Sequence, residues 1–349
     1  MRGVGMADRS LVRIGLIGCG GIANGFHLHD LAQIEGVQVT YYADVSIENA
    51  KATAERWRDH WRGYKITPEP DELIASDSVD AIIVATHHAT HADFGGRAIL
   101  ANKHVLVQKP LTTSMDEADR FVEIAAAHPE IYVQCLPFNW KAEFIEAHRL
   151  ITEGAIGRIC SGRMRIAHSG PPRDSWFYKP EIAGFGASMD MGVYAVSGIT
   201  GLLGPAAECS ALVGTFEQNV RIDDNAIWLL TMESGAFATA ETAWTQVTPV
   251  EGTVIYGTEG VITLREPYEH TLRVYRRTEG ISWNSRGEWT APDPPPDPPA
   301  AAHRHFIQCL RERRRPLGTP EHARHVVEIM LAAHESSRTG NRIHLNTRF

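Results

Sequence analysis

Residues 18–23 read Gly18-Cys19-Gly20-Gly21-Ile22-Ala23, a G-x-G-x-x-A pattern that lies between an apolar run and a helical pattern. The first glycine permits a tight turn from strand to helix, the second lets a ligand approach the backbone, and the alanine lets the helix pack closely on the strand. Unpaired N–H groups at the start of such a helix attract phosphate. The next apolar run ends at Asp44, whose carboxylate would bind ribose hydroxyls and repel a 2′-phosphate. The pattern therefore predicts a dinucleotide, NAD rather than NADP, bound by Gly18, Cys19, Gly20, Gly21, Ile22 and Asp44.

The first third of the chain alternates short apolar runs with helical patterns, which is typical of a parallel, doubly wound α/β sheet, the Rossmann architecture. We expect strands at Leu11–Ile17, Val37–Ala43, Ala81–Thr86, His104–Gln108 and Ile131–Cys135. We expect helices at Ile22–Ile34, Ile47–Trp57, Ala89–Ala101 and Met115–Ala127. Ser114 and Glu117 have the spacing of a capping box at the start of the last helix.

The rhythm changes after about residue 136. We expect, in order, a helix at Lys141–Ile151, a strand at Arg158–Ile166, a loop at His168–Gly186 and a helix at Ser188–Leu203. From Ala206 to Arg276 we expect strands separated by turns. This order predicts an α+β domain with a mainly antiparallel, open sheet. We therefore divide the chain into a loose tail (1–10), an NAD-binding domain (11–136) and a substrate-binding and oligomerisation domain (137–349). The second domain would include a proline-rich connector (291–300) and closing helices within 302–339, the last ending at Gly340.

Composition excludes several partners. The net charge of −8 leaves no basic excess for nucleic acid. No apolar run is long enough to span a membrane, and residues 1–10 do not resemble a signal peptide. The five cysteines are odd in number and none forms a C-x-x-C pair, so we expect neither a disulfide framework nor a zinc knuckle, and a reducing cytoplasm fits best.

A lysine follows the strand at His104–Gln108, and ligands of open α/β sheets lie beyond the carboxyl ends of the strands. The tripeptide Gln108-Lys109-Pro110 resembles the Glu-Lys-Pro mark of the glucose–fructose oxidoreductase / inositol dehydrogenase / rhizopine-catabolism (Gfo/Idh/MocA) family, with Gln108 in place of the acid. Upstream, Thr86 and His91 resemble the threonine and the histidine of a family segment that begins Thr-Pro-Asn, with His87 and His88 in place of the proline and the asparagine. The resemblance extends from Leu11 to Leu345 and implies cofactor contacts from Thr86, His88, His91, Gln108, Lys109 and Asn139.

His87 and His91 are four residues apart and could hold a metal on a helix, but no third ligand is evident, and we expect no metal. Cofactor contacts or packing at the helix start are the alternatives.

A second family landmark is the segment Gly184-Phe185-Gly186-Ala187-Ser188-Met189-Asp190-Met191-Gly192-Val193-Tyr194. It resembles Asp-x-Gly-x-His-x-x-Asp, with Tyr194 at the histidine position, as in a tyrosine-bearing branch of the family. Asp190 and Tyr194 would share one face of a helix, and the glycines would let that helix end approach a small ligand. A tyrosine can transfer protons when a nearby cation lowers its pKa from about 10, and Lys109 is the candidate cation.

The resemblance implies an NAD(P)-dependent oxidoreductase that interconverts a secondary alcohol and a ketone, or a lactol and a lactone, on a sugar, cyclitol or related polyol. Tyr194 would be the acid–base group, with Lys109 and Asp190 beside it. Two alternatives remain: a non-catalytic NAD-binding regulator, and an NAD-dependent glycosidase that oxidises its substrate transiently. Substrate contacts are expected from Trp176, Phe177, Arg163 and His168, although the two aromatic residues could equally serve packing. We expect a homodimer or homotetramer formed through the open sheet.

Overall fold

The computed structural model describes residues 11–137, 141–217, 219–248, 250–265, 271–280, 285–292 and 300–349. The chain divides into two compact units, Met1–Leu136 with Pro298–Pro320, and Pro137–Asp297 with Glu321–Phe349. The expected tail (1–10), Asn139 and most of the proline-rich connector lie outside the described residues.

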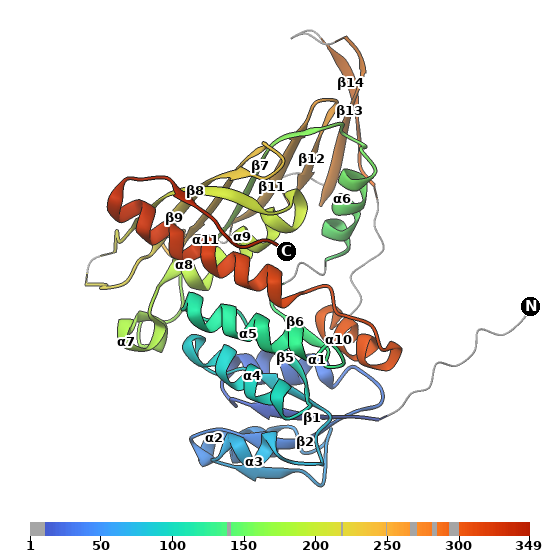
Figure 1. The fold of residues 1–349 in the computed structure, drawn as a ribbon, viewed down its shortest axis with the longest axis vertical. Helices are drawn as coiled ribbons and strands as arrows, with labels where there is room; N and C mark the ends of the chain where they lie inside the picture. The colour runs from blue at the N-terminus through green and yellow to red at the C-terminus, as the bar shows by residue number, and fades with distance from the viewer. Residues whose placement is uncertain are drawn as a thin grey trace, which may run out of the picture. The chain divides into compact units, whose positions relative to one another are not determined.

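The first unit is built on a six-stranded sheet with the order β3-β2-β1-β4-β5-β6 (Figure 1). All five pairings are parallel, and this order is the one of dinucleotide-binding folds. The strands are β1 (Val12–Ile17), β2 (Val37–Ala43), β3 (Lys65–Thr67), β4 (Ala81–Val84), β5 (His104–Val107) and β6 (Val133–Cys135). The helices between them include α2 (Ile47–Arg56), α3 (Pro70–Ile74), α4 (His91–Leu100) and α5 (Met115–Ala127). The predicted parallel α/β sheet is confirmed.

Sequence patterns missed two elements of this unit, β3 and α3. Both are short, and β3 is an edge strand whose first residue, Lys65, is exposed. A three-residue edge strand buries too little apolar surface to show the alternation from which strands are predicted.

The helix expected at Ile22–Ile34 is not one regular helix. Residues Ala23–Leu28 form a π-helix (η1), which continues directly into the short α1 (His29–Leu31). In a π-helix each backbone hydrogen bond joins residues five apart, instead of four apart as in an α-helix, and such segments are frequent at functional sites. The helix expected at Ala89–Ala101 likewise begins with a 3₁₀ turn, η2 (His88–Thr90), before α4.

The capping box expected before α5 does not form. Ser114 occupies the N-cap position, but its side chain makes no capping hydrogen bond. The Glu117 carboxylate accepts instead from the hydroxyl of Thr112, two residues before the cap. Because the Glu117 carboxylate is hydrogen-bonded to this hydroxyl, it does not accept from the Ser114 N–H as a capping box requires.

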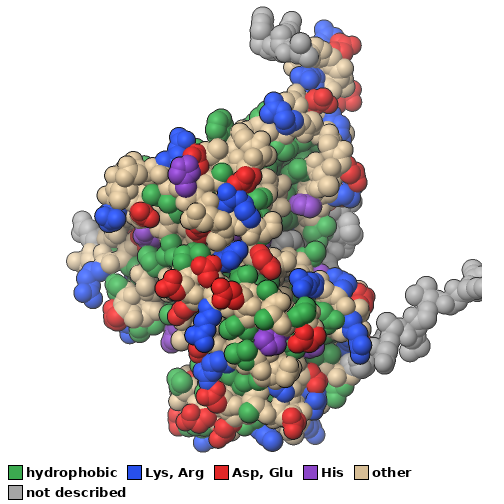
Figure 2. Space-filling view, viewed as in Figure 1, with side chains coloured by type: hydrophobic (Ala, Val, Ile, Leu, Met, Phe, Trp, Pro, Cys, Tyr) green, Lys and Arg blue, Asp and Glu red, His purple; other side chains and the backbone are tan. Residues whose placement is uncertain are grey.

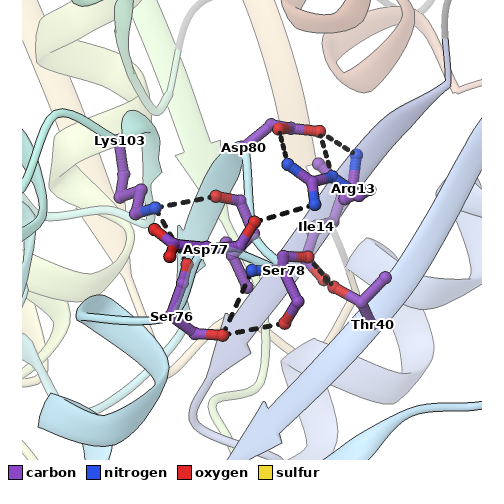
Figure 3. Close-up of polar contacts among 9 residues, drawn as sticks. Arg13, Ile14, Thr40, Ser76, Asp77, Ser78, Asp80 and Lys103 are labelled. Carbon is purple, nitrogen blue, oxygen red and sulfur yellow. Dashed lines mark hydrogen bonds and ion pairs between the residues drawn. The ribbon is translucent and has the colours of Figure 1, made fainter.

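A polar network closes the amino ends of β1, β4 and β5 (Figure 3). The Arg13 guanidinium donates to the Asp80 carboxylate through Nε at 3.0 Å, and Lys103 Nζ donates to the carbonyls of Ser76 and Val79 at 2.9 Å each. Burial alone would raise the pKa of Asp80, but the hydrogen bonds from Arg13 bring it below its ordinary value. This end of the sheet is occupied by internal contacts. A ligand is therefore expected at the carboxyl ends of the strands, where the glycine turn follows β1.

Helix α10 (Ala301–Glu312) belongs to the first unit, whereas we expected both closing helices in the second domain. It lies beside α1 (Figure 1) and is held there by hydrogen bonds. Arg304 Nη2 donates to the Gln33 carbonyl at 2.6 Å, and Gln134 Nε2 donates to the Ala302 carbonyl at 3.0 Å. The first of these hydrogen bonds is exposed and the second is buried. Together they fix the position of α10, although its amphipathic pattern does not reveal its partner.

The second unit contains a nine-stranded sheet with the order β14-β13-β12-β11-β7-β10-β9-β8-β15. Only β7 and β10 pair in parallel, and every other neighbouring pair is antiparallel. The predicted, mainly antiparallel sheet is therefore confirmed. Its strands are β7 (Ile159–Ala167), β8 (Ala206–Gly214), β9 (Asn225–Met232), β10 (Phe237–Ala243), β11 (Val250–Gly257), β12 (Gly260–Leu264), β13 (Leu272–Glu279), β14 (Arg286–Thr290) and β15 (Ile343–His344).

Helices cover one face of this sheet. Residues Ala142–Thr152 form α6, and α11 runs from Pro320 to Thr339 and stops before Gly340, which has the left-handed φ of 73°. Three buried or half-buried histidines fasten α11 to the rest of the unit. The Nε2 atoms of His322, His325 and His334 lie 2.9, 3.0 and 2.8 Å from Thr200 Oγ1, the Ala206 N–H and Ser188 Oγ, respectively.

The helix expected at Ser188–Leu203 is interrupted. It consists of α8 (Ala187–Asp190) and α9 (Gly192–Leu203), separated at Met191. The loop expected at His168–Gly186 contains a 3₁₀ turn, η3 (Trp176–Tyr178), and the short α7 (Pro180–Ala183). Among the described residues, no helix combines the length and the apolar character needed to cross a bilayer.

Candidate active site

The glycine turn after β1 has the conformation that its pattern predicts. Gly18 has φ +92°, and a Cβ there would lie 2.5 Å from the Ala85 carbonyl oxygen, closer than real Cβ atoms come. Gly20 and Gly21 are exposed, and a Cβ on either would meet nothing within 4 Å. Gly18 is therefore required by the fold itself, whereas Gly20 leaves open space beside the backbone, as a bound pyrophosphate would need.

Side chains that sequence reasoning missed brace this turn. Asn24 Nδ2 donates to the Gly20 carbonyl at 3.0 Å, and Thr53 Oγ1 donates to the Cys19 carbonyl at 3.0 Å. Trp57 Nε1 donates to Asn24 Oδ1 at 3.0 Å. Thr53 lies on α2 and Trp57, four residues later, is the C-cap of the same helix, so both face the turn. That spacing was the available signal, but it is too common to identify a brace without the structure.

Asp44 links the turn to the end of β2. Its Oδ2 accepts from the Cys19 N–H at 2.8 Å, and its Oδ1 accepts from the Ser46 N–H at 2.9 Å. A carboxylate has about four lone-pair sites, so two remain for the ribose hydroxyls. The half-buried Asp44 fits an NAD site while also holding the glycine turn.

Cys19 can contribute only its backbone to such a site. The side chain is buried, with Sγ 3.7 Å from the Ala43 carbonyl. Burial, together with the negative charge of Asp44, raises the pKa of this thiol far above its ordinary value. The thiol therefore stays protonated and unreactive at neutral pH.

The loops after β4 and β5 are joined by His91. Its Nδ1 lies 2.7 Å from the Pro110 carbonyl and its Nε2 lies 3.0 Å from the Thr86 carbonyl. Burial lowers the pKa of His91 to about 4, and the ring of His88, also buried, lies 6.1 Å from that of His91. His91 thus positions the two strand-end loops, which favours the packing alternative over a metal site. Within the described ranges, no group of three or more His, Cys, Asp or Glu side chains could hold a metal ion.

Lys109 is 9% exposed and is the second residue after β5, and its peptide bond to Pro110 is cis. Gln108, the residue that departs from the family pattern, is 5% exposed. Its Oε1 accepts from the Lys109 N–H at 2.7 Å, and its Nε2 lies 3.5 Å from His27 Nε2. Sequence reasoning placed no functional weight on His27.

The second unit carries the remaining candidates. Asp190, 6% exposed, ends α8, and the half-buried Tyr194 lies in the first turn of α9, where its N–H donates to the Met191 carbonyl at 3.0 Å. The expected single helix carrying both residues is interrupted between them, so their four-residue spacing does not by itself place them on one face.

The glycines on either side of α8, Gly186 and Gly192, serve packing inside the unit. A Cβ at Gly186 would lie 1.9 Å from the Asp223 carbonyl oxygen, and one at Gly192 would lie 2.4 Å from the Trp228 ring. The Asp223 carboxylate accepts from the N–H groups of Gly186 and Ser188 at 2.7 Å each. The close approach that the glycines permit is thus to the chain's own backbone and rings, whereas we expected an approach to a small ligand.

The predicted substrate contacts occupy different surroundings. Trp176 and Phe177 stack with ring centroids 4.0 Å apart and pack against the buried cluster of Ala183, Ala187, Ile222 and Trp244. The structure therefore supports the packing alternative for these two rings. His168 Nδ1 accepts from the Gly170 N–H at 2.8 Å.

Arg163 is exposed on β7, between the buried Gly162 and Met164. A Cβ on Gly162 would meet Ile199 of α9, and Met164 touches Gly198 of the same helix. Since successive strand residues point to opposite faces, Arg163 extends from the face away from α9. Its expected role in a site beside Tyr194 finds no support in this placement.

A family described as "Oxidoreductase family, NAD-binding Rossmann fold" matches residues 12–135, and the "GFO/IDH/MocA C-terminal domain" matches residues 144–263. A dTDP-3,4-didehydro-2,6-dideoxy-alpha-D-glucose 3-reductase of Actinomadura kijaniata is 30% identical over 234 residues, covering 66% of this chain and 68% of that protein. An inositol 2-dehydrogenase of Acidothermus cellulolyticus is 38% identical over 165 residues, 47% of this chain and 46% of that protein. A 1,5-anhydro-D-fructose reductase of Ensifer adhaerens is 27% identical over 350 residues, 96% of this chain and 99% of that protein.

Solved structures share the fold over nearly the whole chain. GenD2 from gentamicin A biosynthesis, in complex with NAD, superposes with a TM-score of 0.81 at 24% identity and covers 99% of both chains. A levoglucosan dehydrogenase with NADH and levoglucosan superposes with a TM-score of 0.82 at 22% identity, covering 97% of this chain and 100% of that chain. These likenesses confirm the predicted two-part architecture.

Proposed function

The chain belongs to the GFO/IDH/MocA family of oxidoreductases with an NAD-binding Rossmann fold, and on that premise we propose that it interconverts a secondary alcohol and a ketone, or a lactol and a lactone, on a sugar, cyclitol or related polyol. The observation that carries the proposal is the braced glycine turn with Asp44, because open space beside Gly20 and two remaining lone-pair sites on Asp44 suit NAD. The substrate class is supported by the names of the relatives, which act on sugars and on inositol.

NAD, when bound, supplies the hydride acceptor or, as NADH, the donor. The chain's own residues would bind and orient it. The N–H groups at the start of η1 would face the pyrophosphate, and Asp44 would accept from the ribose hydroxyls. Thr86, His88, His91, Gln108 and Asn139 remain proposed contacts of the cofactor.

Proton transfer is assigned to Tyr194. Its Oη would take the proton of the substrate hydroxyl during oxidation and return it during reduction. The Lys109 ammonium would stabilise the phenolate and orient the substrate oxygen, and Asp190 would hydrogen-bond the substrate or hold the tyrosine. General acid–base catalysis of this kind contributes roughly 10² to 10⁴ in rate.

Paired substitutions test these roles. Lys109→Ala and Tyr194→Phe should each lower kcat by roughly 10² to 10⁴ while NAD binding, followed by calorimetry, is retained. Lys51→Ala and Tyr256→Phe are matched controls at exposed positions and should turn over like the wild type. Near-wild-type turnover of both active-site variants would refute the assignment.

One substrate panel separates the alternatives. Polyols and sugars with NAD should produce NADH if the chain is a dehydrogenase. Nitrophenyl glycosides should release nitrophenol without net NADH if it is a glycosidase, and a regulator would bind NAD with no turnover in either assay.

We also propose a homodimer or homotetramer formed through the open face of the nine-stranded sheet. Leu212, Ile227, Leu229 and Phe237 are between 49% and 73% exposed on adjacent strands. Their neighbours along the strands, such as the fully buried Trp228 and Leu230, point to the other face. An apolar area of this kind on a sheet is typical of an interface, and sedimentation velocity measures the mass directly.

The partners and location complete the proposal. Acidic and basic side chains are interspersed over the face drawn in Figure 2, which fits a small-molecule substrate rather than nucleic acid. The five cysteines are free thiols, in keeping with a cytoplasmic location.

A further inference from the structure

A chain of hydrogen bonds within the first unit joins the Gln108–Lys109 turn to an acid on α1. Gln108 Nε2 lies 3.5 Å from His27 Nε2, the longest of the links. His27 Nδ1 lies 2.9 Å from His303 Nε2, and His303 Nδ1 lies 2.9 Å from Asp30 Oδ2. Both histidines are fully buried, and the Asp30 side chain is 15% exposed. Four elements contribute to this chain: the end of β5, η1, α10 and α1.

The groups at the two ends of this hydrogen-bond chain determine which atom donates and which accepts in every link. The Asp30 carboxylate can only accept, so His303 Nδ1 must donate and its Nε2 is left to accept from His27 when the ring is neutral. At the other end, the Lys109 N–H donates to Gln108 Oε1 at 2.7 Å, which turns the amide N–H₂ toward His27. His27 Nε2 must then accept and its Nδ1 must donate. The two requirements agree, so every link has one donor and one acceptor while both imidazoles are neutral.

An aromatic side chain packs against both rings, and the surroundings of His27 favour its neutral form. Phe26 packs on His27 and His303 with centroids 5.0 and 4.8 Å apart. Burial lowers the pKa of His27 well below its ordinary value, and His303 from α10 and His91 from α4 add to the effect.

The other charged groups near this chain lie at its two ends. At the β5 end, the positive charge of Lys109 helps to lower the pKa of His91. At the acidic end, burial would raise the pKa of Asp30, but hydrogen bonds from His303 and His29 lower it below its ordinary value. Asp30 therefore remains a carboxylate, as the direction of the chain requires.

This arrangement explains why an amide suits position 108. With the family's glutamate there, both ends of the chain would be acceptors, and the two imidazoles would have to supply three N–H donors between them. Two neutral imidazoles have only two N–H groups. The hydrogen-bond chain would therefore have to take up one additional proton on its buried side chains.

We propose that Asp30, His303 and His27 are positioning residues for the Gln108–Lys109 turn, and that they form a one-way hydrogen-bond chain matched to glutamine at position 108. The inference deepens the proposed function because it concerns the turn that carries Lys109. Its tests measure proton uptake and tautomers, so they can fail independently of any activity.

Gln108→Glu is the first test, read as urea unfolding of the full chain between pH 6 and 8. The native variant should hold one more proton than the native wild type, whereas the two unfolded chains should bind equal numbers of protons, because the introduced carboxyl group is ionised there. The variant should therefore lose stability relative to wild type as pH rises. Relative to wild type, the folding equilibrium constant should fall about tenfold per pH unit. Gln33→Glu is the matched control, since Gln33 Nε2 also lies near an imidazole, 3.4 Å from His29 Nδ1, but in an exposed place. A Gln108→Glu curve parallel to those of wild type and the control would overturn the proposal.

Reversing the chain provides the second test. In Asp30→Asn with Gln108→Glu, the amide and the carboxylate exchange ends, and both imidazoles can again be neutral with their protons on Nε2. The double variant should therefore lose the additional pH dependence of Gln108→Glu. Persistence of that dependence would contradict a directed chain.

Histidine tautomers in the wild-type protein settle the matter should Gln108→Glu fail to fold. In ¹⁵N-labelled protein, two-bond correlations should show His27 and His303 with the proton on Nδ1, with His27→Gln and His303→Gln used for assignment. A proton on Nε2 of either ring would overturn the proposal.

Discussion

Three glycine-to-alanine substitutions in the phosphate turn should separate what the fold requires from what the cofactor requires. At Gly18, alanine would have to adopt φ +92° with its Cβ 2.5 Å from the Ala85 carbonyl oxygen. The left-handed conformation costs about 1–2 kcal/mol, and overpacking of this kind costs about 1–3 kcal/mol. The sum, about 2–5 kcal/mol, corresponds to a Tm lower by roughly 5–20 °C for a domain of this size.

Gly20→Ala should behave in the opposite way. Its Cβ would meet no atom of the chain within 4 Å, so the folded state accommodates it. Because alanine leaves the unfolded chain less conformational freedom than glycine, the free energy of unfolding should rise by about 0.4–1 kcal/mol. The methyl group would occupy the space in which the pyrophosphate approaches the backbone. We expect NAD to bind about 10- to 100-fold more weakly, which is about 1.4–2.8 kcal/mol.

Gly21→Ala is the matched control, because Gly21 is equally open and the G-x-G-x-x-A pattern permits any residue there. Scanning calorimetry without NAD and isothermal titration with NAD give the two readouts. The reasoning is refuted if Gly18→Ala keeps the wild-type Tm, or if Gly20→Ala binds NAD as tightly as Gly21→Ala.

Acid should destabilise the protein as pH falls from about 6.5 toward 4, because burial lowers the pKa of His322 to about 3 and the unfolded chain takes up a proton that the native state refuses. His322→Gln should remove about 1.4 kcal/mol per pH unit of that slope, and an unchanged slope in urea unfolding would contradict this. Asp44→Asn keeps an acceptor for the Cys19 N–H but loses the negative charge. NAD binding should therefore weaken by roughly 10- to 100-fold, and NADP binding should weaken by less. Titration of the variant with each dinucleotide measures both effects. Leu229→Glu on the open sheet face should yield monomers in sedimentation velocity, whereas Leu100→Glu, at a similarly exposed position of the first unit, should not.

Both sheets and nearly all of the longer elements could be predicted from local patterns. The central strands β1, β4 and β5 are almost entirely buried and read as apolar runs. The predicted strand Val37–Ala43 and helix Met115–Ala127 coincide with β2 and α5. The predictions were wrong where local pattern competes with packing. The π-helix at Ala23–Leu28 and the interruption at Met191 have no signal in the periodicity of the sequence.

The same division holds for the site. The glycine turn and Asp44 are recognisable without a structure, because a phosphate turn needs small residues at specific spacings and a ribose acceptor at the end of the next strand. The surroundings of Gln108 are not recognisable in that way. His27 and His303 are 276 residues apart, and neither has a spacing that predicts a partner. Only the tertiary structure decides that a buried amide, two imidazoles and Asp30 meet in one chain, because hydrogen bonds between buried groups depend on where the backbone brings them and not on how far apart they are in the sequence.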